Sequence, residues 1–269
     1  MRYLVGIVAL FIFVLPSVLT AGIIGCAFDK QTCRYAWDFE EGQRPPNKGF
    51  DNESLGRSQI EIFSGGAFSG DRFGRISVES GDFKMTGRND ETTERAEMST
   101  DRFTNLSGEI HFGVAVRFGP EFNPHDERTL ILQIKPNFTR GFKNSPQFAV
   151  YANESFDRWK VCNDITNLDE CDYNRAKIFK RNVWHTLVVS QNMSKRADGW
   201  LRFYVDGELI YEHVGPTKYN RNEAFTHFRV GIYRNNVATP QRLDVDNFIV
   251  SRDLDAVASF LKLDPTDLK

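Results

Sequence analysis

One short stretch, residues 225–236, concentrates the side chains with the clearest chemical potential. Side chains alternate across a strand, so a strand here would turn Phe228 and Val230 toward a core. Gly231 would leave a gap on the opposite face, where a polar ligand could lie. That face would carry an imidazole, a guanidinium, a phenol and an amide from His227, Arg229, Tyr233 and Asn235. Taken alone, the pattern is equally consistent with an ordinary exposed sheet face.

Two further polar pairs have the spacing that puts both members on one face of a strand. They are Arg95 with Glu97, and Gln133 with Lys135. If both strands neighbour residues 225–236 in one concave sheet, their polar side chains meet those of that stretch. The side chains expected to converge are Arg95, Gln133, Lys135 and Tyr233.

This set of side chains suits β-elimination on a polysaccharide that contains uronic acid. The enzyme must offset the charge of the sugar carboxylate, remove the C5 proton and protonate the leaving oxygen. Arg95 and Gln133 suit the carboxylate, because the planar guanidinium matches its shape. Tyr233 could act as the acid, and also as the base if Arg229 or Lys135 makes its phenol more acidic. Neither a nucleophile nor a metal is required.

Short strands dominate the rest of the chain. The strands that we expect, rich in β-branched and aromatic residues, cover residues 110–118, 129–135, 147–151, 184–190, 201–205, 208–213 and 244–250. Asp206-Gly207 is a strong hairpin signal, and residues 254–263 suggest one short helix. Many strands without interleaved helices predict an all-β sandwich of two antiparallel sheets.

The ordered motifs resemble those of two families of secreted β-jelly-roll lyases. Arg95-Ala-Glu97, Gln133-Ile-Lys135 and the strand from His227 to Asn235 are similar to three motif strands of the alginate lyases. The heparin lyase I-like family adds a wider match in the same order. The matching motifs in this sequence are Ser145-Pro-Gln-Phe148, Trp184-His185, Asp198-Gly199, Asp206-Gly207, Gly231-Ile-Tyr-Arg234 and Asp246-Asn247. The resemblance implies a concanavalin-like β-jelly-roll and lyase activity on an acidic polysaccharide.

The site roles follow from the resemblance together with the residue chemistry. Lys135 stands where the alginate lyases have a histidine, so Tyr233 is our preferred group for both base and acid, with His227 or His185 in reserve. Glu97 is expected to position Arg95. The expected catalytic residues are Tyr233, Gln133, Lys135 and Arg95. The expected substrate-binding residues are Arg229, His227, Asn235 and Tyr151.

Other functions remain open. The same sandwich serves non-catalytic, lectin-like carbohydrate-binding proteins, which is what would remain if Lys135 has abolished activity. A hydrolase ranks lower, because the alternating Glu-x-Asp-x-x-Glu motif of hydrolases on this architecture is absent. No cofactor is expected. A structural Ca²⁺ is a minor alternative, for which Asp244, Asp246 and Asn247 could supply oxygens.

The N-terminus has the features of a signal peptide over residues 1–21, with one basic residue, an apolar run and small residues at its end. We expect residues 22–48 to be a disulfide-bridged N-terminal entry segment and residues 49–269 to be the β-jelly-roll polysaccharide lyase domain. Export predicts an extracellular, secreted protein with no membrane partner. A bacterial lipoprotein signal ending at Cys26 ranks second, because lipidation would leave Cys33 without its partner.

The cysteines and sequons agree with export. The four cysteines fall in two close pairs, and local pairing is our guess among three connectivities. Those pairs are Cys26 with Cys33, and Cys162 with Cys171. Glycosylation sequons occur at Asn52, Asn105, Asn137, Asn153 and Asn192. The formal charge of −2 gives no global field that selects a partner. We expect a monomer whose partner is an acidic polysaccharide and not a nucleic acid.

Overall fold

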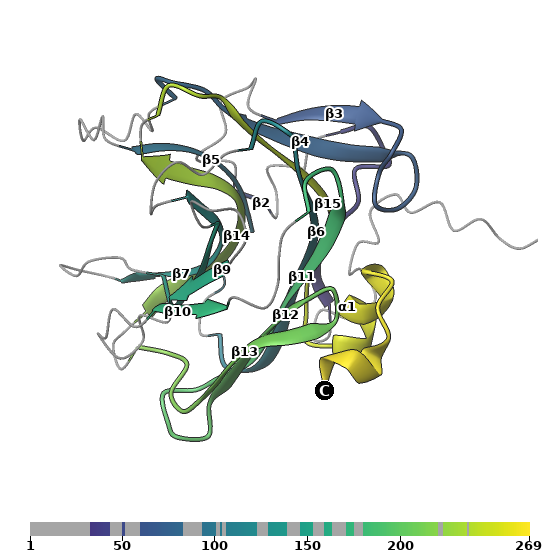
Figure 1. Ribbon diagram of the computed structural model, residues 1–269. Coiled ribbons are helices and arrows are strands. Elements are labelled where there is room, and N and C mark those ends of the chain that lie inside the picture. Colours follow the sequence, from purple (N-terminus) through teal and green to yellow (C-terminus); the bar gives the residue numbers. More distant parts are fainter. Residues whose placement is uncertain are drawn as a thin grey trace, which may run out of the picture.

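The computed structural model is a sandwich of two antiparallel β-sheets, with a short helix at the C-terminus (Figure 1). We call the sheet beside that helix the back sheet and the other the front sheet. The structure describes residues 33–43, 50–51, 60–82, 93–100, 103, 106–122, 129–138, 146–152, 159–162, 171–174, 180–219, 223–235 and 237–269.

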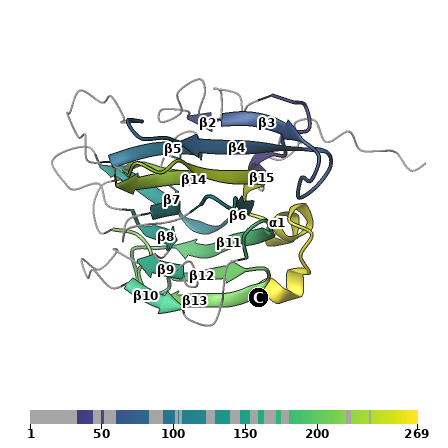
Figure 2. The same ribbon diagram turned by 45° about the horizontal axis from the view of Figure 1, so that its top comes forward.

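The back sheet has the strand order β13-β12-β11-β6-β15-β4-β3 (Figure 2). β1 also pairs with β15. Its members are β1 (Cys33–Trp37), β3 (Ile60–Ser64), β4 (Arg72–Val78), β6 (Gly108–Phe118), β11 (Trp184–Met193), β12 (Trp200–Val205), β13 (Glu208–Val214) and β15 (Gln241–Ser251). The segment before residue 49 therefore supplies one strand of the sandwich.

The front sheet has the order β10-β9-β8-β7-β14-β5-β2. Its members are β2 (Phe50–Asp51), β5 (Thr93–Thr100), β7 (Thr129–Phe138), β8 (Phe148–Ala152), β9 (Trp159–Cys162), β10 (Cys171–Asn174) and β14 (Glu223–Asn235). In Figure 1, both ends of β14 turn away from the back sheet, which leaves the outer face of the front sheet concave.

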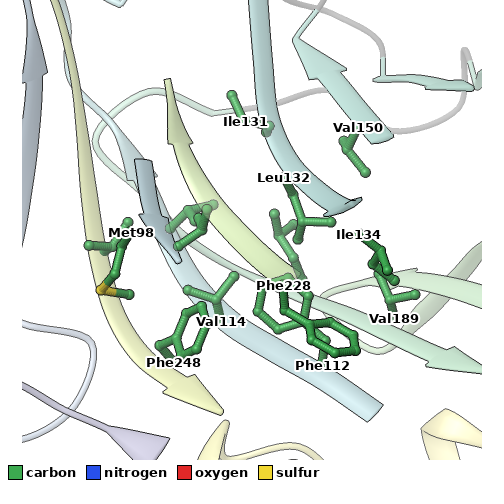
Figure 3. Close-up of a cluster of buried hydrophobic side chains, with 14 of the residues drawn as sticks. Met98, Phe112, Val114, Ile131, Leu132, Ile134, Val150, Val189, Phe228 and Phe248 are labelled. Carbon is green, nitrogen blue, oxygen red and sulfur yellow. The ribbon is translucent and has the colours of Figure 1, made fainter. Parts of the chain in front are cut away.

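The core fills the space between the sheets. Alternate residues of β14 supply Phe228, Val230 and Ile232, all with no exposed surface. Phe228 meets Phe112 of the back sheet edge to face, with ring centroids 5.5 Å apart (Figure 3). The apolar half of the 225–236 pattern is thus confirmed as core, and the polar half must face outward.

The helix α1 (Leu254–Phe260) packs on the outer face of the back sheet (Figure 1). Asp253 caps it by accepting hydrogen bonds from two backbone N–H groups. A Cβ at Gly113 of β6 would lie 2.7 and 2.8 Å from Leu261 and Val257, so the glycine is what lets the helix approach. A short 3₁₀ helix, η1 (Pro265–Leu268), follows.

The all-β fold and the expected strands are confirmed, each within a few residues of its predicted bounds. Asp206 and Gly207 join β12 to β13 with φ of 51° and 80°, as a two-residue hairpin requires. The predicted helix begins at Leu254 but ends at Phe260. The predicted signal peptide lies outside the described residues, and no helix within them is long and apolar enough to cross a membrane.

Candidate active site

The polar face of β14 lies at the centre of the concave front sheet. β5 pairs with β14 on one side and β7 on the other, which is the neighbourhood expected from the sequence. Residues paired across antiparallel strands share a face, so the register sorts the polar side chains into rows. Three rows carry the predicted site residues.

The first row contains Arg95 and Tyr233. They are direct partners across β5 and β14, and the Arg95 guanidinium lies 3.9 Å from the centroid of the Tyr233 ring. The row continues through Leu130 of β7 to Tyr151 of β8. Tyr151 and Tyr233 are both half-buried, so two phenols and a cation line one side of the concave face.

The position next to this row has no side chain on β14, and the backbone imposes that gap. Gly231 lies opposite Glu97. A Cβ on Gly231 would come within 2.2 Å of the Ala96 carbonyl oxygen and 2.7 Å of the Glu97 Cα. Any other residue would therefore collide with β5, and the floor beside Tyr233 must stay open.

The second row is a buried cluster around Arg229. Arg229 lies between Gln133 on β7 and Ser99 on β5. Gln133 Nε2 donates a short hydrogen bond to Glu97 Oε1. Arg229 Nη1 lies 3.6 Å from Glu97 Oε2. We expected Glu97 to position Arg95, but in the structure Glu97 forms its ion pair with Arg229.

The bonding of this cluster is incomplete. Arg229 is 5% exposed, and Glu97 and Gln133 are each 1% exposed. Arg229 Nε and Glu97 Oε2 have no hydrogen-bond partner in the described part of the chain. A buried guanidinium with an unused N–H is costly, and a carboxylate of a ligand would satisfy it.

The third row holds His227 and Lys135, which are direct partners across β14 and β7. His227 Nδ1 lies 3.0 Å from the Thr100 carbonyl oxygen. Because a carbonyl only accepts, Nδ1 carries the hydrogen and the neutral ring has its lone pair on Nε2. His227 and Tyr233 are six positions apart along β14, with five residues between them. The predicted catalytic residues therefore share one concave face but occupy three rows.

The opposite face of β14 carries an ion pair that the sequence did not reveal. Arg234 and Glu94 are direct partners, and both are almost completely buried. Glu94 Oε2 accepts from Arg234 Nε at 2.9 Å, while Oε1 accepts from the Gly81 backbone at 2.7 Å. Arg234 Nη1 also donates to the Thr239 carbonyl oxygen at 2.6 Å. The pair fixes β14 to β5 directly behind Tyr233 and Arg95.

Other predicted residues lie away from these rows. Asn235 is the partner of Thr93 at the end of β14. His185, a reserve base in the sequence interpretation, is on β11 of the back sheet, with Nδ1 2.9 Å from Asp206 Oδ2 and Nε2 accepting from the Lys180 backbone. It therefore has a structural role at the hairpin and does not join Tyr233.

The oxygens considered for calcium do not fit that ion. Asp244 is bound by two cations, Arg75 at 2.6 Å and Arg117 at 2.8 Å, which would repel Ca²⁺. Asp246 accepts from three backbone N–H groups. Burial raises the pKa of Asp246 to about 7, against those hydrogen bonds, which lower it. Asp246 and Asn247 thus tie β15 to residues 68–69 and to α1, while Asp244 ties it to β4 and β6.

The cysteines and sequons are only partly described. Cys162 and Cys171 are direct partners across β9 and β10. Cys33 lies on β1, but Cys26 is outside the described residues. Asn192 donates to the Asp198 carbonyl oxygen at 2.9 Å, and Asn137 lies on β7. The sequons at Asn52, Asn105 and Asn153 lie outside the described residues, and both modifications stay predictions.

Comparison with protein families gives one match that spans most of the chain. The family model described as "Polysaccharide lyase" matches residues 39–248. A search of curated proteins finds no match.

Several solved structures share the fold. The endo-β-1,4-glucuronan lyase of the fungus Trichoderma reesei is 16% identical, with a TM-score of 0.63 over 84% of this chain and 98% of that one. The cellulose induced protein Cip1 is 12% identical, with a TM-score of 0.55 over 81% and 97%. An alginate lyase Aly36B double mutant in complex with an alginate trisaccharide is 11% identical, with a TM-score of 0.53 over 80% and 96%.

Proposed function

We propose that this chain, which belongs to the polysaccharide lyase family, cleaves a uronic-acid-containing polysaccharide by β-elimination. The observation that carries the proposal is the register of the front sheet. It places a phenol beside Arg95 and a buried, incompletely bonded Arg229 beside Gln133 on one concave face. The glucuronan and alginate lyases among the similar structures support an acidic substrate.

Binding of the sugar carboxylate is the first requirement. Arg229 offers an unused Nε–H inside a cluster from which water is largely excluded, where a charge-assisted hydrogen bond is strong. Gln133 is its partner on β7, and Arg95 and Lys135 lie in the other two rows of the same face. Neutralising the carboxylate stabilises the carbanion that forms when C5 loses its proton.

Proton transfer is the second requirement, and we assign it to Tyr233. As the phenolate it accepts the C5 proton, the C4–C5 double bond forms and the C4–O4 bond breaks. The resulting phenol then returns that proton to O4, so the enzyme ends as it began. The open floor at Gly231 lets the reacting sugar lie between Tyr233 and Arg229.

His227 is the alternative base. Its Nδ1–H is directed to the Thr100 carbonyl oxygen, so in the neutral ring Nε2 is the nitrogen that carries the lone pair. In that case Tyr233 would serve as the acid alone. Tyr233→Phe and His227→Gln separate the two assignments, because only the variant that lacks the base loses exchange of the C5 proton with deuterated solvent.

The function is tested by incubating the purified protein with a panel of uronate polymers and following the ultraviolet absorbance of the unsaturated uronate product. The panel contains glucuronan, alginate and heparin-like chains. We expect absorbance to rise with at least one polymer and Tyr233→Phe to abolish the rise. Binding of a polymer without any cleavage would refute the lyase assignment and favour a lectin-like protein of the same fold.

We also propose that the protein acts outside the cell. The apolar N-terminal run, the paired positions of Cys162 and Cys171 and the five sequons support this location. Mass spectrometry of the secreted protein would give the mature N-terminus, the disulfide pairing and the occupied sequons. We propose a monomer, for which the elution volume in size-exclusion chromatography is the test.

A further inference from the structure

Glu97 is a negative charge in the middle of a surface that must bind a polyanion. Its carboxylate is 1% exposed and lies opposite the open floor at Gly231. One oxygen accepts from Gln133, and the other lies 3.6 Å from Arg229 without a hydrogen bond. A buried anion next to a substrate carboxylate repels it and so weakens binding. The presence of Glu97 here therefore calls for another role.

That use follows from the strands that it joins. Glu97 is on β5, Arg229 on β14 and Gln133 on β7, so one carboxylate links three neighbouring strands on the concave face. Gln133 has an amide that can turn either way, and a carboxylate accepts only from its N–H₂ end. The carboxylate therefore fixes which end of Gln133 points at Glu97, and it limits the directions open to the Arg229 guanidinium.

We propose that Glu97 is a positioning residue that holds Arg229 and Gln133 in the geometry needed for the substrate carboxylate. The inference rests on the proposed function. The contact between Glu97 and Arg229 is long, so the guanidinium can still donate hydrogen bonds to a second carboxylate. A tight two-point ion pair with Glu97 would prevent this. Glu97 thus acts through two other side chains and does not itself contact the reacting atoms.

The test compares two changes of a buried carboxylate to an amide. Glu97→Gln keeps the size of the side chain and removes its charge. Asp244→Asn makes the same change in the back sheet, where Asp244 is 2% exposed and bound by Arg75 and Arg117. We expect Glu97→Gln to lower kcat about 10- to 100-fold, because small errors in position are amplified in the transition state. KM should change much less, and Asp244→Asn should leave kcat unaltered below its melting temperature.

A double mutant shows whether Glu97 acts through Arg229. In the Arg229→Gln background, Glu97→Gln should have little further effect on kcat, since the residue to be positioned is already gone. If Glu97→Gln folds poorly, Glu97→Asp replaces it in the test. This variant keeps the charge on a shorter side chain, and its kcat should lie between those of Glu97→Gln and the wild type. Circular dichroism checks that each variant is folded.

The outcomes separate the two proposals. If the wild type cleaves a uronate polymer but Glu97→Gln keeps the wild-type kcat, Glu97 is not a positioning residue and only this inference fails. Full additivity of Glu97→Gln and Arg229→Gln would also overturn it. A wild type that cleaves none of the polymers overturns the proposed function, and this inference with it.

Discussion

Individual charged residues decide what the concave face can bind, and Arg229 is the most constrained of them. Its guanidinium is nearly buried and its Nε has no hydrogen-bond partner in the described residues. Such a group is stabilised when an anion arrives, which makes it a better ligand for a carboxylate than an exposed cation would be. The identity of the cation should therefore matter as well as its charge.

We predict that Arg229→Lys lowers kcat/KM for a uronate polymer about 10- to 100-fold, because lysine keeps the charge but loses the planar fork. Steady-state rates of double-bond formation measure the effect. The matched control is Arg202→Lys in the back sheet, where Arg202 pairs with Glu212 at the surface and should tolerate the change. Equal rates for Arg229→Lys and wild type would mean that Arg229 acts only as a point charge.

His111 gives a pH-dependent prediction at the same scale. Burial lowers its pKa from 6.5 to about 4, and its Nδ1 lies 2.7 Å from Ser190 Oγ. Between these two values the unfolded chain takes up a proton that the folded protein does not, so the contribution of His111 to the free energy of unfolding falls as the pH drops from 6.5 to 4. The loss attributable to His111 is roughly 3 kcal/mol by the linkage relation.

Urea unfolding at several pH values measures this loss. The His111→Gln variant cannot take up the proton, so its stability should fall less over the same pH range. Asp246 has the opposite effect, because its raised pKa makes the free energy of unfolding fall as the pH rises. That contribution is the same in the wild type and in His111→Gln, so it cancels when the two are compared. Parallel pH profiles for the two proteins would contradict the prediction.

The alternation of residues 227–235 was enough to predict which side chains leave the core, and so was the spacing of Arg95 with Glu97 and of Gln133 with Lys135. The partners of Glu97 were not predictable. They depend on the register between strands far apart in sequence, and that register shifts between Val230 and Tyr233. A two-residue spacing contains no information about such a shift.

At the scale of the strand, Gly231 fixes how closely β14 can approach β5. We predict that Gly231→Ala lowers stability by about 1 to 3 kcal/mol or more, because the added methyl would meet the backbone of β5 at 2.2 Å. Thermal unfolding measures the change. Gly81→Ala is the control, since a Cβ there meets nothing within 4 Å; its positive φ of 95° should cost less than a clash. An unchanged melting temperature for Gly231→Ala would contradict the close approach.

The ion pair behind the site is a second feature of the same strands. Glu94→Gln would leave the Arg234 guanidinium buried without its counter-charge, at a cost of about 3 to 5 kcal/mol. Urea unfolding should show a lower midpoint. Replacing both partners, as Glu94→Gln with Arg234→Met, should be less harmful than the single change. If the double variant is the less stable one, the contribution of the pair has been misjudged.

Neither ion-pair partner could be assigned from the sequence, because charged residues at strand ends are usually exposed. Glu94 and Glu97 are three residues apart and therefore point to opposite faces of β5. That much is visible in the sequence. The sequence does not show whether Glu94 or Glu97 points toward the core. That is decided by which face of β5 the back sheet covers.

For the whole molecule, a near-neutral net charge hides a local excess of cations. The formal charge is −2, yet among the described side chains of β5, β7 and β14 the concave face carries Arg95, Arg229 and Lys135 beside the single acid Glu97. We predict that KM for a uronate polymer rises several-fold as ionic strength increases from about 0.05 to 0.5 M, because salt screens surface charges beyond a few ångströms. The KM of Lys135→Gln should depend less on ionic strength than that of the wild type. A wild-type KM that does not change with ionic strength would argue against an acidic substrate.

The position of β15 has a consequence for biosynthesis. It is the last strand of the chain, yet it lies inside the back sheet, where it pairs with β6 on one side and with β4 and β1 on the other. A ribosome must therefore complete residues 241–251 before β1, β4 and β6 can be joined. Until then, two strand edges stay open to other chains. Folding should be slow and largely post-translational, and a chain that ends before β15 should aggregate.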